Sequence, residues 1–151
     1  MRDQITTAMK NAMRAKRADE LSTLRMVNAA IKDRDIAARG DGNPDGITDA
    51  DILGLLGKMI KQRQDSAKAF SDAGRTEMAD KEIAEIAVIE AFLPKQLSEA
   101  EVTDAVKAAI AEVGAESLRD MGKVMGALKG QYAGQMDFGK AGAAVKALLA
   151  G

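Results

Sequence analysis

Residues 48–92 read TDADILGLLGKMIKQRQDSAKAFSDAGRTEMADKEIAEIAVIEAF, and this stretch determines the architecture of the chain. Its apolar residues recur three and four positions apart, which is the spacing of one face of an α-helix. Gly74 interrupts the pattern, so we predict two long helices joined by a short turn and packed antiparallel as a hairpin. The predicted core positions are Ile52, Leu55, Leu56, Met59 and Ile60 in the first helix, which Thr48 caps, and Ile83, Ile86 and Ile89 in the second, which runs from about Arg75 to Phe92.

Two more helices are predicted before this hairpin. One runs from about Asp3 to Lys16, and the next begins near Asp19 to Ser22 and leads to an exposed loop, RGDGNPDGI, at residues 39–47. Their expected buried residues are Ile5, Ala8, Met9, Ala12 and Met13, then Leu21, Leu24, Val27 and Ile31. The outer face of the second helix carries Arg25, Asn28, Lys32 and Arg39, which we interpret as solvated surface in preference to a binding face. Residues 1–92 are therefore expected to form an N-terminal four-helix region.

The segment LPKQL at residues 93–97 marks a boundary between two domains. Pro94 ends the fourth helix, and Ser98 with Glu101 forms a capping box that begins the fifth. Gly114 closes that helix. Asp137 is expected to cap the last helix, whose core residues are Ala141, Ala144, Val145, Leu148 and Leu149. The predicted fold class is all-α, with an N-terminal bundle of long helices followed by a small three-helix C-terminal domain at residues 98–151.

The stretch DMGKVMGALKG at residues 120–130 is unusual for a helix, because three glycines recur at every fourth position. The predicted core stripe is Met121, Val124, Met125 and Leu128, and roughly opposite to it lie Gly122, Gly126 and Gly130 together with Arg119, Lys123 and Lys129. Each interior glycine costs about 1 kcal/mol of helix propensity relative to alanine. Two interpretations remain open: the glycines admit a neighbouring helix while the lysines are solvated, or the strip faces a ligand such as a phosphate backbone.

The composition excludes several function classes. Hydrophobic residues make up 46% of the 151, enough for a core, but the chain has no cysteine and no histidine, which removes thiol and imidazole catalysis and Cys or His zinc sites. Asp41, Asn43 and Asp45 alternate as at the start of a calcium loop, yet no glutamate follows at the required spacing. The carboxylates otherwise occupy helix caps and solvated faces, so we predict no catalytic residue, no metal and no cofactor.

The charge is small overall and uneven along the chain. The formal net charge is −1, while residues 1–39 hold nine Lys and Arg against five Asp and Glu. This N-terminal excess favours nucleic acid only modestly, and salt would screen it readily.

No apolar run approaches the length of a membrane span, and the first residues lack the apolar region of a signal peptide. The expected compartment is the cytoplasm, without a membrane or DNA partner.

Several motifs together resemble the GatB/YqeY family. LRMVNAAIKDR, MIKQRQDSAKAFSDAGR and EIAEIAVIEAFLPKQL are similar to stand-alone YqeY-like proteins. LPKQLSEAEV, SLRDMGKVMGALKG and AVKALL, over about residues 98–151, resemble the tail domain of the GatB component of the glutamine-dependent aspartyl/glutamyl-tRNA amidotransferase. In that enzyme the tail domain contacts the tRNA body, so the resemblance implies a tRNA-contacting role for Gly122, Lys123, Gly126 and Lys129.

The resemblance and the residues together favour a non-catalytic tRNA-binding accessory module of translation, with Arg119 joining the glycines and lysines. The alternative is a protein-interaction module that docks on an amidotransferase, an aminoacyl-tRNA enzyme or another translation enzyme. The amidotransferase family is labelled a carbon–nitrogen ligase with glutamine as amido-N-donor. This chain has no recognisable motif for that chemistry. Any such activity is expected to need partner subunits.

Overall fold

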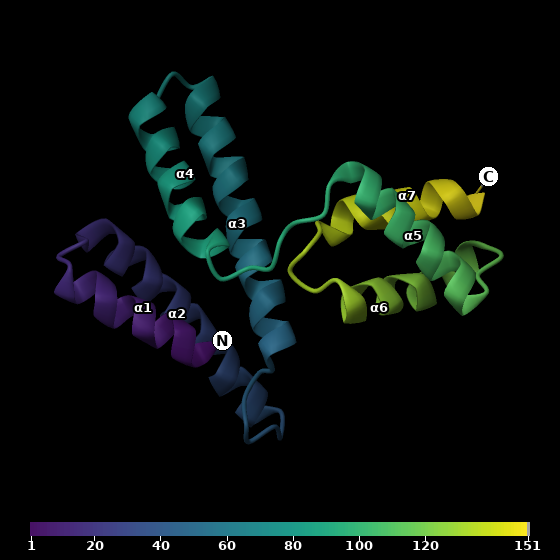
Figure 1. Ribbon diagram of the computed structural model, residues 1–151, viewed down its shortest axis with the longest axis horizontal. Coiled ribbons are helices and arrows are strands. Elements are labelled where there is room, and N and C mark those ends of the chain that lie inside the picture. The colour runs from purple at the N-terminus through teal and green to yellow at the C-terminus, as the bar shows by residue number, and fades with distance from the viewer. Residues whose placement is uncertain (151) are drawn as a thin grey trace. The chain divides into compact units, whose positions relative to one another are not determined.

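The computed structural model describes residues 1–150, and over this range every regular element is helical, which confirms the predicted all-α class (Figure 1). The chain divides into two compact units, the first formed by Met1–Leu93 and the second beginning at Pro94. Each unit has its own cluster of buried apolar side chains.

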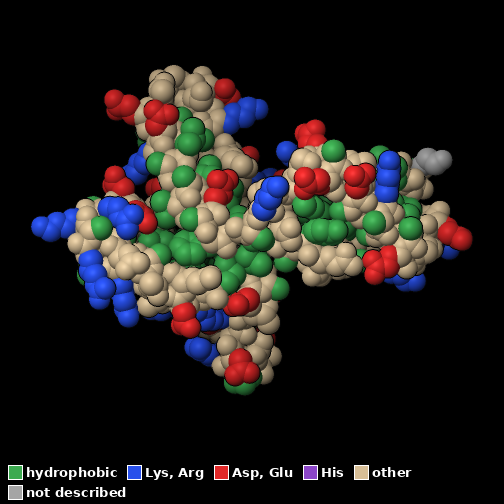
Figure 2. Space-filling model, in the orientation of Figure 1, with side chains coloured by type: hydrophobic (Ala, Val, Ile, Leu, Met, Phe, Trp, Pro, Cys, Tyr) green, Lys and Arg blue, Asp and Glu red, His purple; other side chains and the backbone are tan. Residues whose placement is uncertain are grey.

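The first unit consists of two helical hairpins (Figure 1). Helices α1 (Arg2–Arg14) and α2 (Ala18–Gly40) form one, and α3 (Asp49–Asp72) and α4 (Thr76–Glu90) form the other, with α2 also packing against α4. The core combines residues from all four helices: Ile5, Val27, Ile31, Ile52, Leu56, Met59, Ile60, Ile86 and Ile89. Lys and Arg side chains gather over the α1–α2 hairpin (Figure 2), where the sequence has its basic excess.

In this unit, capping hydrogen bonds and residues in the left-handed conformation determine where helices begin and end. Thr48 caps α3 as predicted: its Oγ1 accepts a hydrogen bond from the Asp51 amide at 3.2 Å, and the Asp51 carboxylate accepts one from the Thr48 amide at 3.0 Å. Gly74, at φ +73°, ends the first helix of the α3–α4 hairpin. Helix α1 ends two residues earlier than predicted, because Lys16 adopts the left-handed conformation at φ +57° without a glycine to signal it.

Three predicted core residues are exposed. Met13 and Ile83 are each 56% exposed, and Leu148 is 43% exposed. Helical spacing marks the apolar side of a helix, but burial also requires that a neighbouring helix reach that position. Met13 and Leu148 lie in the last turns of their helices, and Ile83 lies outside the buried stripe of α4 formed by Ala79, Ile86 and Ile89.

The second unit contains α5 (Glu99–Val113), a 3₁₀ turn (Leu118–Asp120), α6 (Met121–Gln131) and α7 (Phe138–Ala150), and its three α-helices pack pairwise. Their shared core is rich in small residues: Ala105, Val106, Ala109, Val124, Leu128, Met136, Ala141 and Val145. The Ser98 hydroxyl accepts a hydrogen bond from the Glu101 amide at 3.2 Å, Gly114 ends α5 at φ +64°, and the Asp137 carboxylate accepts one from the Gly139 amide at 2.8 Å. These three residues cap or end their helices as predicted, but only one of the two hydrogen bonds of the predicted Ser98–Glu101 capping box is formed.

The connection between α4 and α5 is attached to the second unit. The Leu97 amide donates to the carbonyl of Gln135 at 2.8 Å, and the Gln96 side-chain amide donates to the carbonyl of Gly134. Gly134, at φ +75°, lies in the turn that precedes α7. Gln96 and Leu97 thus hold the start of α5 against this turn.

Candidate nucleic-acid interface

The predicted interface lies on α6 and the 3₁₀ turn before it. A capping box sets this turn: the Asp120 carboxylate accepts hydrogen bonds from the backbone amides of Glu116 at 3.0 Å and Ser117 at 3.3 Å. These bonds lower the pKa of Asp120, and the charge of Lys123 lowers it further. Val124 and Leu128 are fully buried, so the opposite side of α6 faces solvent.

All predicted contact residues lie on that exposed side. We call them the α6 strip, which comprises Arg119, Gly122, Lys123, Gly126 and Lys129. A Cβ atom placed on Gly122, Gly126 or the adjacent Gly130 would meet no atom within 4 Å. No helix of the second unit therefore lies against the strip, and the first interpretation, in which these glycines admit a neighbouring helix, does not hold within this unit.

Close helix packing occurs on the other side of α6. A Cβ on Gly142 of α7 would lie 3.6 Å from the Met121 methyl group and 3.9 Å from Met125, which is ordinary van der Waals contact. The contact between α6 and α7 thus uses the methionine stripe of α6 and a glycine of α7. Packing in this unit provides no reason for the α6 glycines, which together cost about 3 kcal/mol relative to alanine.

The cations of the α6 strip are available to a ligand. Within residues 1–150, Arg119, Lys123 and Lys129 make no hydrogen bond or ion pair through their side chains. Tyr132, just beyond α6, packs against the core of the second unit and acts as a turn-packing residue. The strip therefore offers positive charge beside backbone that no side chain covers.

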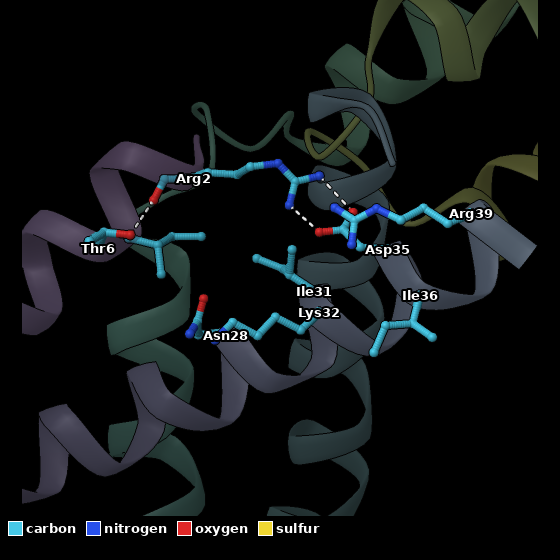
Figure 3. Close-up of a pocket in the computed structure, with 9 residues that line it drawn as sticks. Arg2, Thr6, Asn28, Ile31, Lys32, Asp35, Ile36 and Arg39 are labelled. Atoms are coloured by element: carbon cyan, nitrogen blue, oxygen red, sulfur yellow. Dashed lines mark hydrogen bonds and ion pairs between the residues drawn. The ribbon is translucent and has the colours of Figure 1, made fainter. Parts of the chain in front are cut away.

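A second polar site lies between α1 and α2, where Figure 3 shows the guanidinium groups of Arg2 and Arg39 directed toward the Asp35 carboxylate. Asp35 accepts two hydrogen bonds from Arg2, at 2.5 and 2.8 Å, and one from the Ile47 amide at 2.9 Å. Arg2 also donates to the Ile47 carbonyl at 2.7 Å. Arg2 and Asp35 thus connect the start of α1, the end of α2 and the loop before α3.

The loop before α3 can approach Asp35 only because residue 46 is glycine: Gly46 has φ +79°, and a Cβ atom there would collide with the Asp35 carboxylate.

The sequence interpretation did not identify Arg2 or Asp35. A signal was present, because Asp35 continues the buried stripe of Leu24, Val27 and Ile31 at helical spacing. A carboxylate on the core side of a helix indicates a partner elsewhere in the fold.

We expect the Arg2–Asp35 pair to make stability depend on acid pH. The Arg2 hydrogen bonds, then the Ile47 amide and the charge of Arg39, lower the pKa of Asp35 in the folded chain. The stabilisation is therefore fully present above the unfolded pKa of about 3.9 and is lost as pH falls through the lower folded value. The variant Asp35→Asn should lower the unfolding midpoint at pH 7 by several degrees and flatten its decrease in acid. Circular dichroism melts from pH 7 to pH 2.5 measure both effects.

The matched control is Asp33→Asn, an exposed carboxylate on the same helix that lies outside this site. It should follow the wild-type curve. Equal acid profiles for wild type and Asp35→Asn would show that the ion pair contributes nothing to folding.

The described residues show neither of two common functional features. Among residues 1–150, no three His, Cys, Asp or Glu side chains are grouped so that they could hold a metal ion. In the same range, the helices are too short or too polar to cross a bilayer. What the fold presents is an all-helical protein of two units whose most distinctive surface is a cationic, glycine-lined helix face.

Comparison with known proteins identifies the family. The chain belongs to the family described as Yqey-like protein, which matches residues 2–149. It is 33% identical over 128 residues to "Altered inheritance of mitochondria protein 41, mitochondrial" of Pyrenophora tritici-repentis, covering 82% of this chain and 68% of that protein. The protein of the same name from Clavispora lusitaniae is 35% identical over 56% of this chain and 46% of its own length. An uncharacterised protein of Schizosaccharomyces pombe is 31% identical, with coverages of 62% and 72%.

Proposed function

We propose that this protein is a non-catalytic tRNA-binding accessory module of translation, related to the glutamine-dependent tRNA amidotransferase. The observation that carries the proposal is the α6 strip, in which exposed glycines at one-turn spacing lie beside three cations whose side chains make no hydrogen bond or ion pair among residues 1–150. Phosphate groups can approach bare backbone more closely than backbone covered by side chains, and the cations provide the attraction. Contacts of this kind position RNA without reading its sequence.

We expect binding to fall steeply with salt. If Arg119, Lys123 and Lys129 each neutralise one phosphate, the slope of log affinity against log salt is roughly −2 to −3. Raising the salt from about 50 to about 200 mM should then weaken tRNA binding about 30-fold. Fluorescence anisotropy with labelled tRNA at several salt concentrations measures this slope. Affinity that does not change with salt would exclude a phosphate-based interface.

A second candidate is a protein-interaction module that docks on an amidotransferase or another translation enzyme. The same exposed glycines favour it, because small residues one turn apart let a partner helix approach closely. The two candidates differ in the cations, which tRNA binding requires and helix docking uses little. Reversing the charge of Lys123 and Lys129 therefore separates them.

Catalysis is assigned to partners in this proposal. Amide transfer from glutamine, the reaction of a carbon–nitrogen ligase with glutamine as amido-N-donor, would take place on an amidotransferase or aminoacyl-tRNA enzyme to which this chain contributes tRNA contacts. The cytoplasm remains the proposed compartment for this chain. The Pyrenophora and Clavispora relatives are named as mitochondrial proteins, and both compartments contain tRNA.

We also propose that residues 1–92 and 98–151 are separate domains joined by residues 93–97. The separate apolar cores support this division. Limited proteolysis should then cut first near Leu93 and leave a folded C-terminal fragment. Simultaneous degradation of both parts would contradict it.

A further inference from the structure

The pocket between α1 and α2 is a second candidate binding site, independent of the α6 strip. It has a volume of about 400 Å³, which is in the range of small-molecule sites. One face of α2 lines it with Asn28, Ile31, Lys32, Asp35, Ile36 and Arg39, which follow one another at helical spacing. Helix α1 contributes Arg2, Ile5 and Thr6 in the same way.

The floor of the pocket is aliphatic. Ile5 and Ile31 form it and are almost fully buried, whereas Ile36 at the rim is 65% exposed. Ile36 is thus a large apolar side chain that the folded unit leaves in water beside an apolar cavity. A ligand with an aliphatic body would cover Ile36 and gain the free energy of removing that side chain from water, because Ile5 and Ile31 are already buried.

Two of the polar side chains that line the pocket have no partner among the described residues, whereas Thr6 donates to the Arg2 carbonyl at 3.0 Å. Within residues 1–150, the side chains of Asn28 and Lys32 make no hydrogen bond or ion pair. Arg39 uses its Nε to donate to the Pro44 carbonyl at 3.3 Å, and its guanidinium is directed toward Asp35, but its terminal N–H groups make no hydrogen bond among the described residues. Arg2, by contrast, is engaged by Asp35 (Figure 3). The pocket thus combines three cations with one carboxylate, so its excess charge is positive.

We propose that this pocket binds a small aliphatic monocarboxylate, whose carboxylate pairs with Lys32 and Arg39 and whose hydrocarbon chain lies on the isoleucines. We expect inorganic phosphate to bind more weakly, because it has no hydrocarbon chain to cover Ile36. The aliphatic floor decides against a polyanion such as RNA, which has no apolar segment to cover it.

The probe is hexanoate, titrated into the full-length protein by calorimetry and by ¹⁵N chemical-shift mapping. A ligand of this size should bind with a dissociation constant on the order of 1 mM. Shifts should be confined to α1, α2 and the loop of residues 41–48. Butanoate, which is two methylenes shorter, should bind about 15-fold more weakly, since each buried methylene contributes about fourfold, and uncharged hexanol should bind at least about tenfold more weakly.

The variant Lys32→Gln should weaken hexanoate binding about tenfold, and Lys32→Gln with Arg39→Gln should abolish it. Arg25→Gln, an exposed change of the same charge on α2 outside the pocket, should have no effect. Equal binding of hexanoate and hexanol, no effect of Lys32→Gln, tighter binding of inorganic phosphate, or tRNA-induced shifts in this pocket would each overturn the proposal. Charge reversal at Lys123 and Lys129 should leave hexanoate binding intact, so this proposal and the tRNA proposal can fail separately.

Discussion

Replacing Lys123 and Lys129 together with glutamate should weaken tRNA binding about 100-fold at low salt, because two charge-assisted phosphate contacts become repulsive. Both lysines are exposed and make no hydrogen bond or ion pair within residues 1–150, and Lys123 acts on Asp120 only through its charge, so the fold should be unchanged. Fluorescence anisotropy with labelled tRNA measures the loss, and circular dichroism checks the fold. If the protein is instead a helix-docking module, the same variant should still bind its protein partner with only slightly reduced affinity.

The matched control reverses two other exposed lysines of the second unit, Lys107 on α5 and Lys146 on α7. This variant has the same net charge as the Lys123/Lys129 variant, so it separates a local contact from general electrostatic attraction. It should lose no more than a few-fold in affinity. Equal losses in the two variants would show that tRNA responds to net charge alone and that α6 has no special role.

Changing Gly122, Gly126 and Gly130 together to alanine should stabilise the second unit by about 2–3 kcal/mol, because each replacement gains helix propensity and the added methyl groups meet no atom within 4 Å. The same variant should bind tRNA about tenfold more weakly, since a ligand no longer reaches the backbone as closely. Urea denaturation and anisotropy measure the two effects on one preparation.

Gly54→Ala provides the control, because Gly54 is another exposed helical glycine with open space around it, but on α3 of the first unit. It should stabilise its own unit by about 1 kcal/mol and leave tRNA binding unchanged. A triple variant that is stabilised and still binds tRNA fully would show that the α6 glycines serve no ligand.

Most of the fold was predictable because helical periodicity and capping are local. The hairpin of α3 and α4, the cap at Thr48 and the breaks at Gly74 and Gly114 depend on residues close together in sequence. The exposure of Ile83 was not predictable, since it depends on how far a neighbouring helix reaches. The early end of α1 was missed because a lysine, and not a glycine, adopts the left-handed conformation there.

The two candidate binding surfaces differ in how far sequence predicts them. The α6 strip lies on one short helix, so its exposed face followed from spacing alone. The α1–α2 pocket joins residues up to 37 positions apart, from Arg2 to Arg39, and its ion pair spans 33 positions. Lys32 and Arg39 are exposed, as expected for the solvated surface that the sequence predicts, and Asn28 is half-buried. Spacing along α2 could not show that these three residues line a pocket, because the pocket also needs α1 beside them.

Chemical-shift mapping with ¹⁵N-labelled protein shows whether tRNA contacts the α6 strip. Glycine amides resonate in a separate region of the spectrum, so Gly122, Gly126 and Gly130 can be followed individually as tRNA is added at low salt. We expect these three amides, with those of Arg119, Lys123 and Lys129, to shift or broaden first. Saturable binding that leaves them unchanged, or no binding at low salt, would contradict a tRNA interface on α6.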